Sequence, residues 1–216
     1  MTKTVSQIPG CDGCPMQSLN RTNKFVSPQL PDPACDLNRL VIAEAPGGKE
    51  SEKGQPLVGP AGQLFNSLLK KAGIPREGLT IINCINCQPP KNAFPTDSKA
   101  RKAISKEDAQ IAVDHCIKHH VDPVIRERDW ARVDLLGGKA LRFVAKIEKG
   151  GISKLRGHRI EIQRAGLKPV VGVPIYHPSY LKQWGQSKKP VTVDDLKSDL
   201  GQLPQFGTAP EIKAEA

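Results

Sequence analysis

Short apolar segments that alternate with helical patterns constrain the fold of this chain more than any other feature. Segments typical of buried strands lie at 40–43, 79–83, 133–136 and 170–173. Apolar residues recur at helical spacing between them, as from Leu64 to Leu69, and Gly73 then closes that helix. Alternation of this kind predicts a three-layer αβα fold with a central, mostly parallel, four-stranded sheet.

Other segments complete this prediction. Residues 159–162 alternate as an amphipathic strand, and helices are expected at 107–124, through Leu141 and Val144 after Gly137-Gly138, and at 193–203. Polar loops are expected from Gly48 to Leu57 and from Lys91 to Lys106, the second of them mobile. The 216-residue length suits one domain over 1–204, with proline-rich loops at 1–38 and a disordered tail at 205–216.

The charge balance favours a polyanionic partner. The chain carries 32 lysines and arginines against 22 acidic residues, a net charge of +10. Such a surplus is typical of proteins that bind nucleic acid, although a merely soluble basic protein can carry it too. No stretch resembles a signal peptide, and none is a run of 18 apolar residues. We therefore expect a cytoplasmic protein with no membrane partner. We also expect a monomer.

Six cysteines stand in a pattern typical of a metal site. Cys11 and Cys14, and again Cys84 and Cys87, have C-x-x-C spacing, and Cys116 follows on an expected helix. Two thiolates at this spacing reach one metal from a tight turn. Four thiolates suit zinc or an iron–sulfur cluster equally, and spacing does not choose between them. The alternative is that these cysteines are small buried apolar residues.

Polar residues follow three of the expected strands. Glu44 stands after the first, Asn83 after the second and His177 after the last. Ligands of parallel α/β sheets bind beyond the carboxyl ends of the strands. These three positions are therefore the main candidates for function.

Six motifs in this order resemble the iron–sulfur uracil-DNA glycosylases, often called family 4, and the resemblance runs from about Cys11 to Trp184. The motifs are Cys11 with Cys14, Ala43-Glu44-Ala45-Pro46-Gly47, Pro56-Leu57-Val58-Gly59-Pro60-Ala61-Gly62, Asn83 with Cys87-Gln88-Pro89-Pro90, Cys116, and His177-Pro178-Ser179.

The resemblance implies a monofunctional DNA glycosylase. Such an enzyme hydrolyses the N-glycosidic bond of uracil, or of a related modified pyrimidine, flipped out of single- or double-stranded DNA. The resemblance also implies a [4Fe-4S] cluster held by Cys11, Cys14, Cys87 and Cys116. Cys35 and Cys84 would then not bind the cluster. The two C-x-x-C pairs alone would instead make Cys84, rather than Cys116, the fourth ligand.

By the same resemblance, three residues have roles in the chemistry. The Asn83 amide is expected to pair with uracil O4 and N3–H, and His177 to stabilise negative charge at O2. Glu44 is the candidate that positions water or stabilises the cationic sugar. As alternatives, Asn83 caps a turn, His177 is structural and Glu44 is a surface carboxylate. The positions expected to bind substrate are Ala45, Gly47, Leu57, Asn83, Ser179 and Leu181, the last being a wedge or a core residue.

Several positions depart from the family pattern. Leu57 replaces the phenylalanine expected to stack on the base, and Ala43 replaces a glycine. Ala45 stands where the best-known branch of the superfamily has an aspartate. The interval to Cys116 is long and basic over 92–106, but it holds no histidine for covalent trapping of DNA. Leu57 and Ala45 favour the alternative of a family member that binds DNA or a modified base without excision. A zinc-stabilised structural domain is a third hypothesis.

Overall fold

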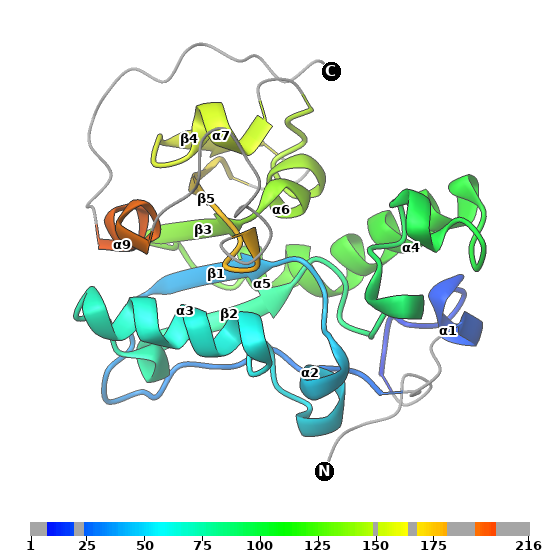
Figure 1. Ribbon diagram of the computed structural model, residues 1–216, viewed down its shortest axis with the longest axis horizontal. Coiled ribbons are helices and arrows are strands. Elements are labelled where there is room, and N and C mark those ends of the chain that lie inside the picture. Colours follow the sequence, from blue (N-terminus) through cyan, green and yellow to red (C-terminus); the bar gives the residue numbers. More distant parts are fainter. Residues whose placement is uncertain (1–7, 20–23, 149–150, 164–167, 181–192, 202–216) are drawn as a thin grey trace.

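A parallel sheet with one antiparallel edge forms the centre of the computed structural model (Figure 1). The structure describes residues 8–19, 24–148, 151–163, 168–180 and 193–201. Within them the sheet has five strands in the order β2-β1-β3-β5-β4. The strands are β1 (Arg39–Ala43), β2 (Leu79–Asn83), β3 (Arg132–Leu136), β4 (Ile160–Ile162) and β5 (Val170–Ile175).

The strand pairing brings the candidate residues to one edge of the sheet. β1 lies parallel to β2 and β3, and β3 lies parallel to β5. The last register pair of β1 and β2 joins Ala43 to Asn83, so Glu44 follows directly beside Asn83. The expected number of four strands was wrong, because β4 adds a fifth strand, antiparallel to β5. The expected three-layer, mostly parallel architecture is confirmed.

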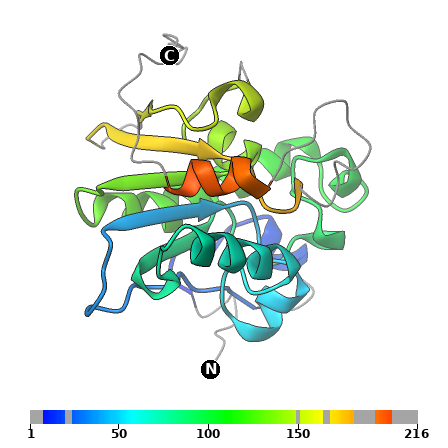
Figure 2. The ribbon, with the colours of Figure 1, turned by 60° about the vertical axis from the view of Figure 1, so that its left-hand side comes forward.

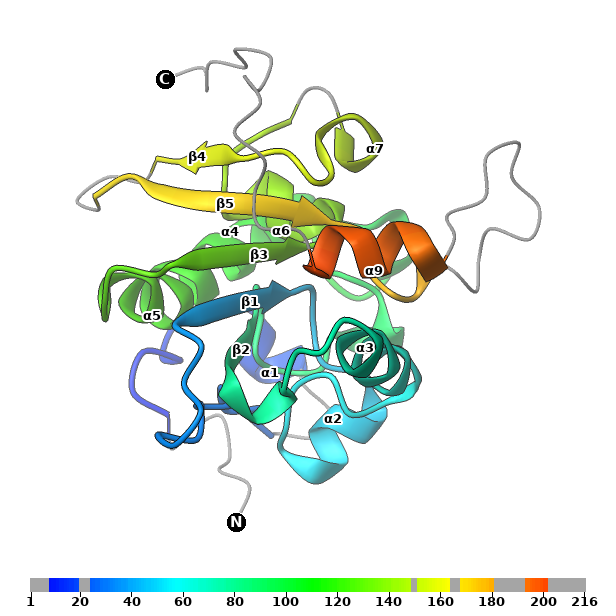
Figure 3. The ribbon, with the colours of Figure 1, turned by 90° about the vertical axis from the view of Figure 1, so that its left-hand side faces the viewer.

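Helices cover both faces of this sheet. Figure 3 shows α3 and α9 on one side and α4 and α6 on the other, and Figure 2 shows α9, in red, on the same side of the strands as α3. β3 is a central strand and is buried along its whole length, as expected between two helical layers. β2 is equally buried although it ends the strand order, and its backbone pairs with Gln29 through Ile81. The α-helices are α1 (Met16–Leu19), α2 (Gly48–Lys53), α3 (Pro60–Lys71), α4 (Lys106–Cys116), α5 (Asp122–Arg126), α6 (Gly138–Phe143), α7 (Gly151–Leu155) and α9 (Val193–Gly201).

The helix expected at 107–124 is interrupted. A π-helical turn, η5 (Ile117–Val121), lies between α4 and α5. Extra residues inserted into a helix in this way often mark functional sites. The turn directly follows Cys116 and carries His120.

The two polar loops expected from the sequence are more structured than predicted. α2 lies within the first, and the second contains the 3-10 turns η3 (Pro90–Asn92) and η4 (Ser98–Ala100). A third 3-10 turn, η2 (Arg76–Gly78), precedes β2. The segment from Lys91 to Lys106 exposes its basic side chains but buries Phe94 and Ile104. These two apolar residues pack against the rest of the protein, which the polar composition of the segment does not predict.

A second, smaller core lies apart from the main sheet. It combines the N-terminal segment with the segment after β2 and with α4, which Figure 1 shows beside α1. Its buried residues are Cys11, Met16, Phe25, Cys87, Ala93, Ala100, Ile104, Ala109 and Ala112. The N-terminal loops are therefore held against the body of the protein.

Among the described residues, no helix is both long and apolar enough to cross a membrane. The expected wedge Leu181 and the expected tail at 205–216 lie outside the described residues, as do the last two residues of the helix expected at 193–203.

Candidate active site and metal centre

Glu44 directly follows β1 and is partly buried. Burial raises the pKa of its carboxyl group to about 7, because a desolvated carboxylate is disfavoured. The Lys139 ammonium nearby lowers this pKa and the Asp97 carboxylate raises it further. Lys139 and Asp97 themselves form an ion pair, so the long segment after β2 reaches the site through Asp97. Glu44 is therefore not a simple surface carboxylate.

Asn83 ends β2 and is only 1% exposed. In the part of the chain that the structure describes, its Nδ2 has no hydrogen-bond partner. A buried amide without a partner is costly, so such a group is expected to meet a ligand or water. The backbone N–H of Asn83 donates to Oδ1 of Asn86 over 3.3 Å. The Asn83 side chain thus stays available while its backbone is held.

His177 follows β5, and its ring is oriented by Ser179. Nδ1 lies 2.7 Å from Oγ of Ser179 and accepts a hydrogen bond from the backbone N–H of the same residue over 3.3 Å. Burial lowers the pKa of the imidazole to about 4, although the Glu50 carboxylate acts in the opposite direction. The ring is therefore neutral at neutral pH. Since Nδ1 is an acceptor, Nε2 carries the proton.

Glu50 is a site residue that the sequence analysis missed. It is buried in α2, and its carboxylate accepts from the backbone N–H groups of Gly47, Val58 and Gly59 over 3.2, 3.0 and 2.6 Å. These bonds tie two family-like motifs together beside His177. A glutamate three residues after Gly47, at the N3 position of a helix, was a capping signal in the sequence.

Leu57 lies in the left-handed region of the backbone, with φ of 50°, and is 4% exposed. A non-glycine residue rarely adopts this conformation outside sites where the surroundings impose it. Arg76 holds the loop by donating to the carbonyls of Leu57 and Pro56 over 2.9 and 2.7 Å. A Cβ on Gly62 would lie 1.9 Å from the Leu57 carbonyl oxygen, so this glycine permits the close approach.

The remaining substrate-binding candidates lie in the segments that follow β1 and β5. Ala45 and Gly47 are partly buried after β1, and the Gly47 N–H is committed to Glu50. Ser179 is also partly buried and contacts His177 as described. The structure thus brings Glu44, Asn83 and His177 to the carboxyl edge of the sheet, on β1, β2 and β5.

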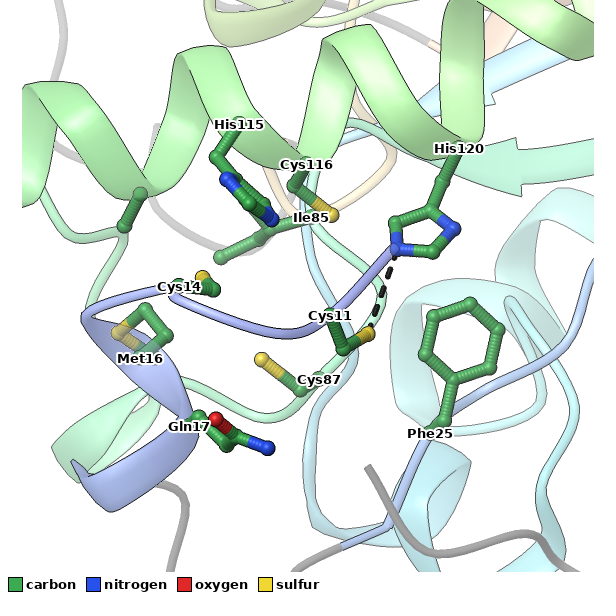
Figure 4. Close-up of a pocket in the computed structure, with 11 residues that line it drawn as sticks. Cys11, Cys14, Met16, Gln17, Phe25, Ile85, Cys87, His115, Cys116 and His120 are labelled. Atoms are coloured by element: carbon green, nitrogen blue, oxygen red, sulfur yellow. Dashed lines mark hydrogen bonds between the residues drawn. The ribbon is translucent and has the colours of Figure 1, made fainter. Parts of the chain in front are cut away.

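Four cysteines line one cavity, which we call the cysteine cavity (Figure 4). Its lining residues are Cys11, Cys14, Met16, Gln17, Phe25, Ile85, Cys87, Ala112, His115, Cys116 and His120. Cys84 is buried elsewhere in the main core, and Cys35 does not line the cavity. The cavity therefore contains the set that the resemblance implies, with Cys116, and not the set of two C-x-x-C pairs, with Cys84.

The cysteine cavity is apolar, and burial there disfavours thiolates. Burial raises the pKa of Cys11 to about 11 and of Cys87 to about 12, and raises that of Cys116 strongly. Two polar groups nevertheless face the sulfurs. Nε2 of His120 lies 3.3 Å from Sγ of Cys11, and Nδ2 of Asn86 donates to Sγ of Cys116 over 3.8 Å. Hydrogen-bond donors at sulfur suit cysteines that act as thiolate ligands.

The cysteine cavity places four sulfur atoms where a metal or a cluster could bind. Among the described residues, no three histidine, cysteine or acidic side chains stand close enough to hold a single metal ion. A tetrahedral zinc site needs its sulfurs about 2.3 Å from one centre. Four cysteines at one cavity match the ligand number of both a zinc site and an iron–sulfur cluster.

The fold and these sites define a member of the uracil DNA glycosylase superfamily. Residues 31–201 match the model of that family, and the chain belongs to it. The chain is 34% identical over 175 residues to a type-4 uracil-DNA glycosylase of Thermotoga maritima, covering 81% of this chain and 79% of the relative. Identity is 29% over 181 residues with that of Archaeoglobus fulgidus, with the same coverage, and 25% with that of Pyrobaculum aerophilum, covering 93% and 91%.

Proposed function

We propose that this chain is a monofunctional DNA glycosylase that hydrolyses the N-glycosidic bond of uracil, or of a related pyrimidine, flipped out of DNA. The observation that carries the proposal is a buried Asn83 amide, whose Nδ2 has no partner among the described residues, at the same sheet edge as a neutral His177. The relatives named as type-4 uracil-DNA glycosylases support the same reaction.

Asn83 supplies base recognition in this proposal. Its Nδ2 donates to uracil O4 while Oδ1 accepts from N3–H, which pairs one amide with one pyrimidine edge. Cytosine presents an amino group and an unprotonated N3 at these positions, so the same amide orientation rejects it. Binding of uracil also satisfies the buried donor that has no partner within the described residues.

His177 stabilises the leaving base. As the glycosidic bond breaks, negative charge develops on uracil O2, and the Nε2–H of a neutral imidazole donates to it. The low pKa of His177 keeps this ring from ionising at neutral pH. The neutral ring therefore acts as a hydrogen-bond donor whose proton stays at Nε2 throughout.

Glu44 acts on the sugar side. In its ionised form the carboxylate orients water toward the anomeric carbon and stabilises positive charge on the sugar. Its pKa of about 7 means that a substantial fraction is protonated at neutral pH, so the reaction depends on pH there. The +10 charge of the chain supplies attraction to the DNA backbone.

The four cysteines of the cavity are proposed to hold a [4Fe-4S] cluster. Bound there, the cluster would supply a covalent tie between the N-terminal segment, the turn after β2 and α4. No chemical step of base excision passes through it. Its expected signature is a brown protein with absorbance near 400 nm and iron and sulfide in equal amounts, which zinc would not give.

Base release tests the proposal directly. The purified holoprotein is incubated with oligonucleotides that carry uracil, hydroxymethyluracil, thymine or cytosine, and free base and abasic sites are quantified. Release of uracil that is lost in His177→Ala and Asn83→Ala supports the proposal. Specific binding to uracil-containing DNA without any release would instead support a member that binds and does not excise.

A further inference from the structure

One short turn joins the candidate active site to the cysteine cavity. It runs from Asn83 to Cys87, so a base-reading residue and a cluster-ligand candidate are its two ends. Its backbone also contacts the first motif, because the N–H of Cys84 donates to the Ala43 carbonyl over 2.8 Å and that of Ile85 donates to the Glu44 carbonyl over 3.4 Å. The conformation of this turn therefore affects both sites.

Asn86 is the polar side chain in the middle of this turn, and it is 1% exposed. Its Oδ1 accepts from the backbone N–H of Asn83 over 3.3 Å, and its Nδ2 donates to Sγ of Cys116 over 3.8 Å. The backbone N–H of Asn86 also hydrogen-bonds this sulfur, and its carbonyl accepts from Val26 over 2.7 Å. A single buried amide thus has one end at each site.

Only one orientation of the Asn86 amide satisfies both ends. Reversal would place the NH₂ group against the N–H of Asn83 and the oxygen against the sulfur of Cys116, and both contacts are repulsive when Cys116 is a thiolate ligand. A thiolate ligand accepts a hydrogen bond more strongly than a thiol does. A ligating Cys116 would hold Nδ2 in place, and Oδ1 would then be fixed toward Asn83.

We propose that Asn86 is a positioning residue that couples the cluster ligand Cys116 to the base-reading Asn83. The inference rests on the proposed function, because it takes Asn83 as the residue that reads the pyrimidine. Asn86 touches neither the base nor the sugar. It acts by orienting the backbone that carries Asn83, and by stabilising the thiolate of Cys116.

Two variants of Asn86 distinguish its hydrogen bond with Asn83 from its hydrogen bond with Cys116. Asn86→Leu has a similar shape and removes both hydrogen bonds. Asn86→Asp keeps an acceptor for the Asn83 N–H but places negative charge against the Cys116 thiolate. Cys84→Ala is the matched control, since it truncates a buried side chain in the same turn and leaves both bonds in place.

The experiment uses the holoproteins and measures two quantities. The first is affinity for oligonucleotides with 2′-fluorinated deoxyuridine, whose glycosidic bond resists hydrolysis, against the same oligonucleotides with deoxycytidine, which presents the opposite hydrogen-bonding edge to Asn83. The second is the rate at which the absorbance near 400 nm is lost in the presence of an iron chelator. Neither measurement requires turnover.

For Asn86→Leu we expect roughly tenfold weaker discrimination for uracil and roughly tenfold faster bleaching, as for other residues that orient metal ligands. Asn86→Asp should bleach fastest while keeping more of the discrimination than Asn86→Leu. If Asn86→Leu matches Cys84→Ala in both quantities, the coupling is overturned.

The proposed function fails separately from this inference. A wild-type holoprotein that prefers uracil-containing DNA but releases no base would contradict excision, and both measurements on Asn86 would still apply. A wild-type holoprotein that shows no preference for uracil would overturn the coupling, because Asn83 would then read no base.

Discussion

The backbone N–H of Ser179 donates to Nδ1 of His177 over 3.3 Å, and this bond fixes the proton of the neutral imidazole on Nε2. The Ser179 hydroxyl lies 2.7 Å from the same nitrogen and reinforces the arrangement. Nε2–H is the group that the proposed chemistry needs, because it donates to the oxygen on which charge develops.

Substitutions at His177 and at Ser179 are expected to lower the rate of base release by different amounts. His177→Ala should lower kcat roughly 10²- to 10³-fold, as removal of an oxyanion donor does. Ser179→Ala keeps the backbone donor and should lower kcat much less. Single-turnover base release measures both. An effect of Ser179→Ala as large as that of His177→Ala would show that the backbone bond does not orient the ring.

The pH dependence of excision should follow Glu44. Burial raises the pKa of this carboxyl group to about 7, and the reaction needs the ionised form. The rate should therefore fall as pH drops below about 7 and level off above it. His177 adds no second transition in the neutral range, because its pKa is about 4. Glu44→Gln should be slow and insensitive to pH there, and an unchanged acid limb in this variant would assign the transition to another group.

Substitutions of Lys139 and of Asp97 should shift the low-pH limb of the rate profile in opposite directions. The Lys139 ammonium lowers the pKa of Glu44 and the Asp97 carboxylate raises it. In Lys139→Met the midpoint of the limb should move to higher pH, and in Asp97→Asn to lower pH. Rate profiles of base release against pH check both shifts. Movement in the same direction in both variants would mean that breaking their ion pair, rather than charge at Glu44, controls the profile.

Glu44, Asn83 and His177 could be found from the sequence, because strands are recognised from a local pattern. Ligands of parallel sheets bind beyond the carboxyl ends of the strands, so the polar residues there became candidates. Glu50 was hidden, since its contacts are to backbone groups of Val58 and Gly59 in another loop. Asn86 was hidden for the same reason, as its partner Cys116 lies 30 residues away. The antiparallel addition of β4 likewise depends on a long-range pairing with β5.

Composition was misleading for the segment from Lys91 to Lys106. Its many charged side chains predicted a mobile loop, yet Phe94 is buried and stacks on Phe143 with ring centroids 5.4 Å apart. Lys139 also lies over the Phe94 ring, at 5.0 Å from its centroid. Phe94, together with the buried Ile104, anchors the segment, and residue counts do not weigh such contacts.

Gly137 and Gly138 provide a matched pair of substitutions that tests how closely His177 is positioned. Gly137 has φ of 95°, and a Cβ there would lie 3.0 Å from Cβ of His177. Gly138 begins α6, and a Cβ there meets nothing within 4 Å. Gly137→Ala should therefore displace His177, while Gly138→Ala should leave it in place.

The expected cost of Gly137→Ala has two parts. Alanine at positive φ destabilises the fold by about 1 kcal/mol or more, which lowers the midpoint of thermal unfolding. Displacement of His177 should also reduce base release in conditions where the variant is fully folded, since small misplacements of a catalytic group cost up to about 10²-fold. Gly138→Ala should retain wild-type base release and equal or higher stability. Full activity in folded Gly137→Ala would show that His177 tolerates movement at this contact.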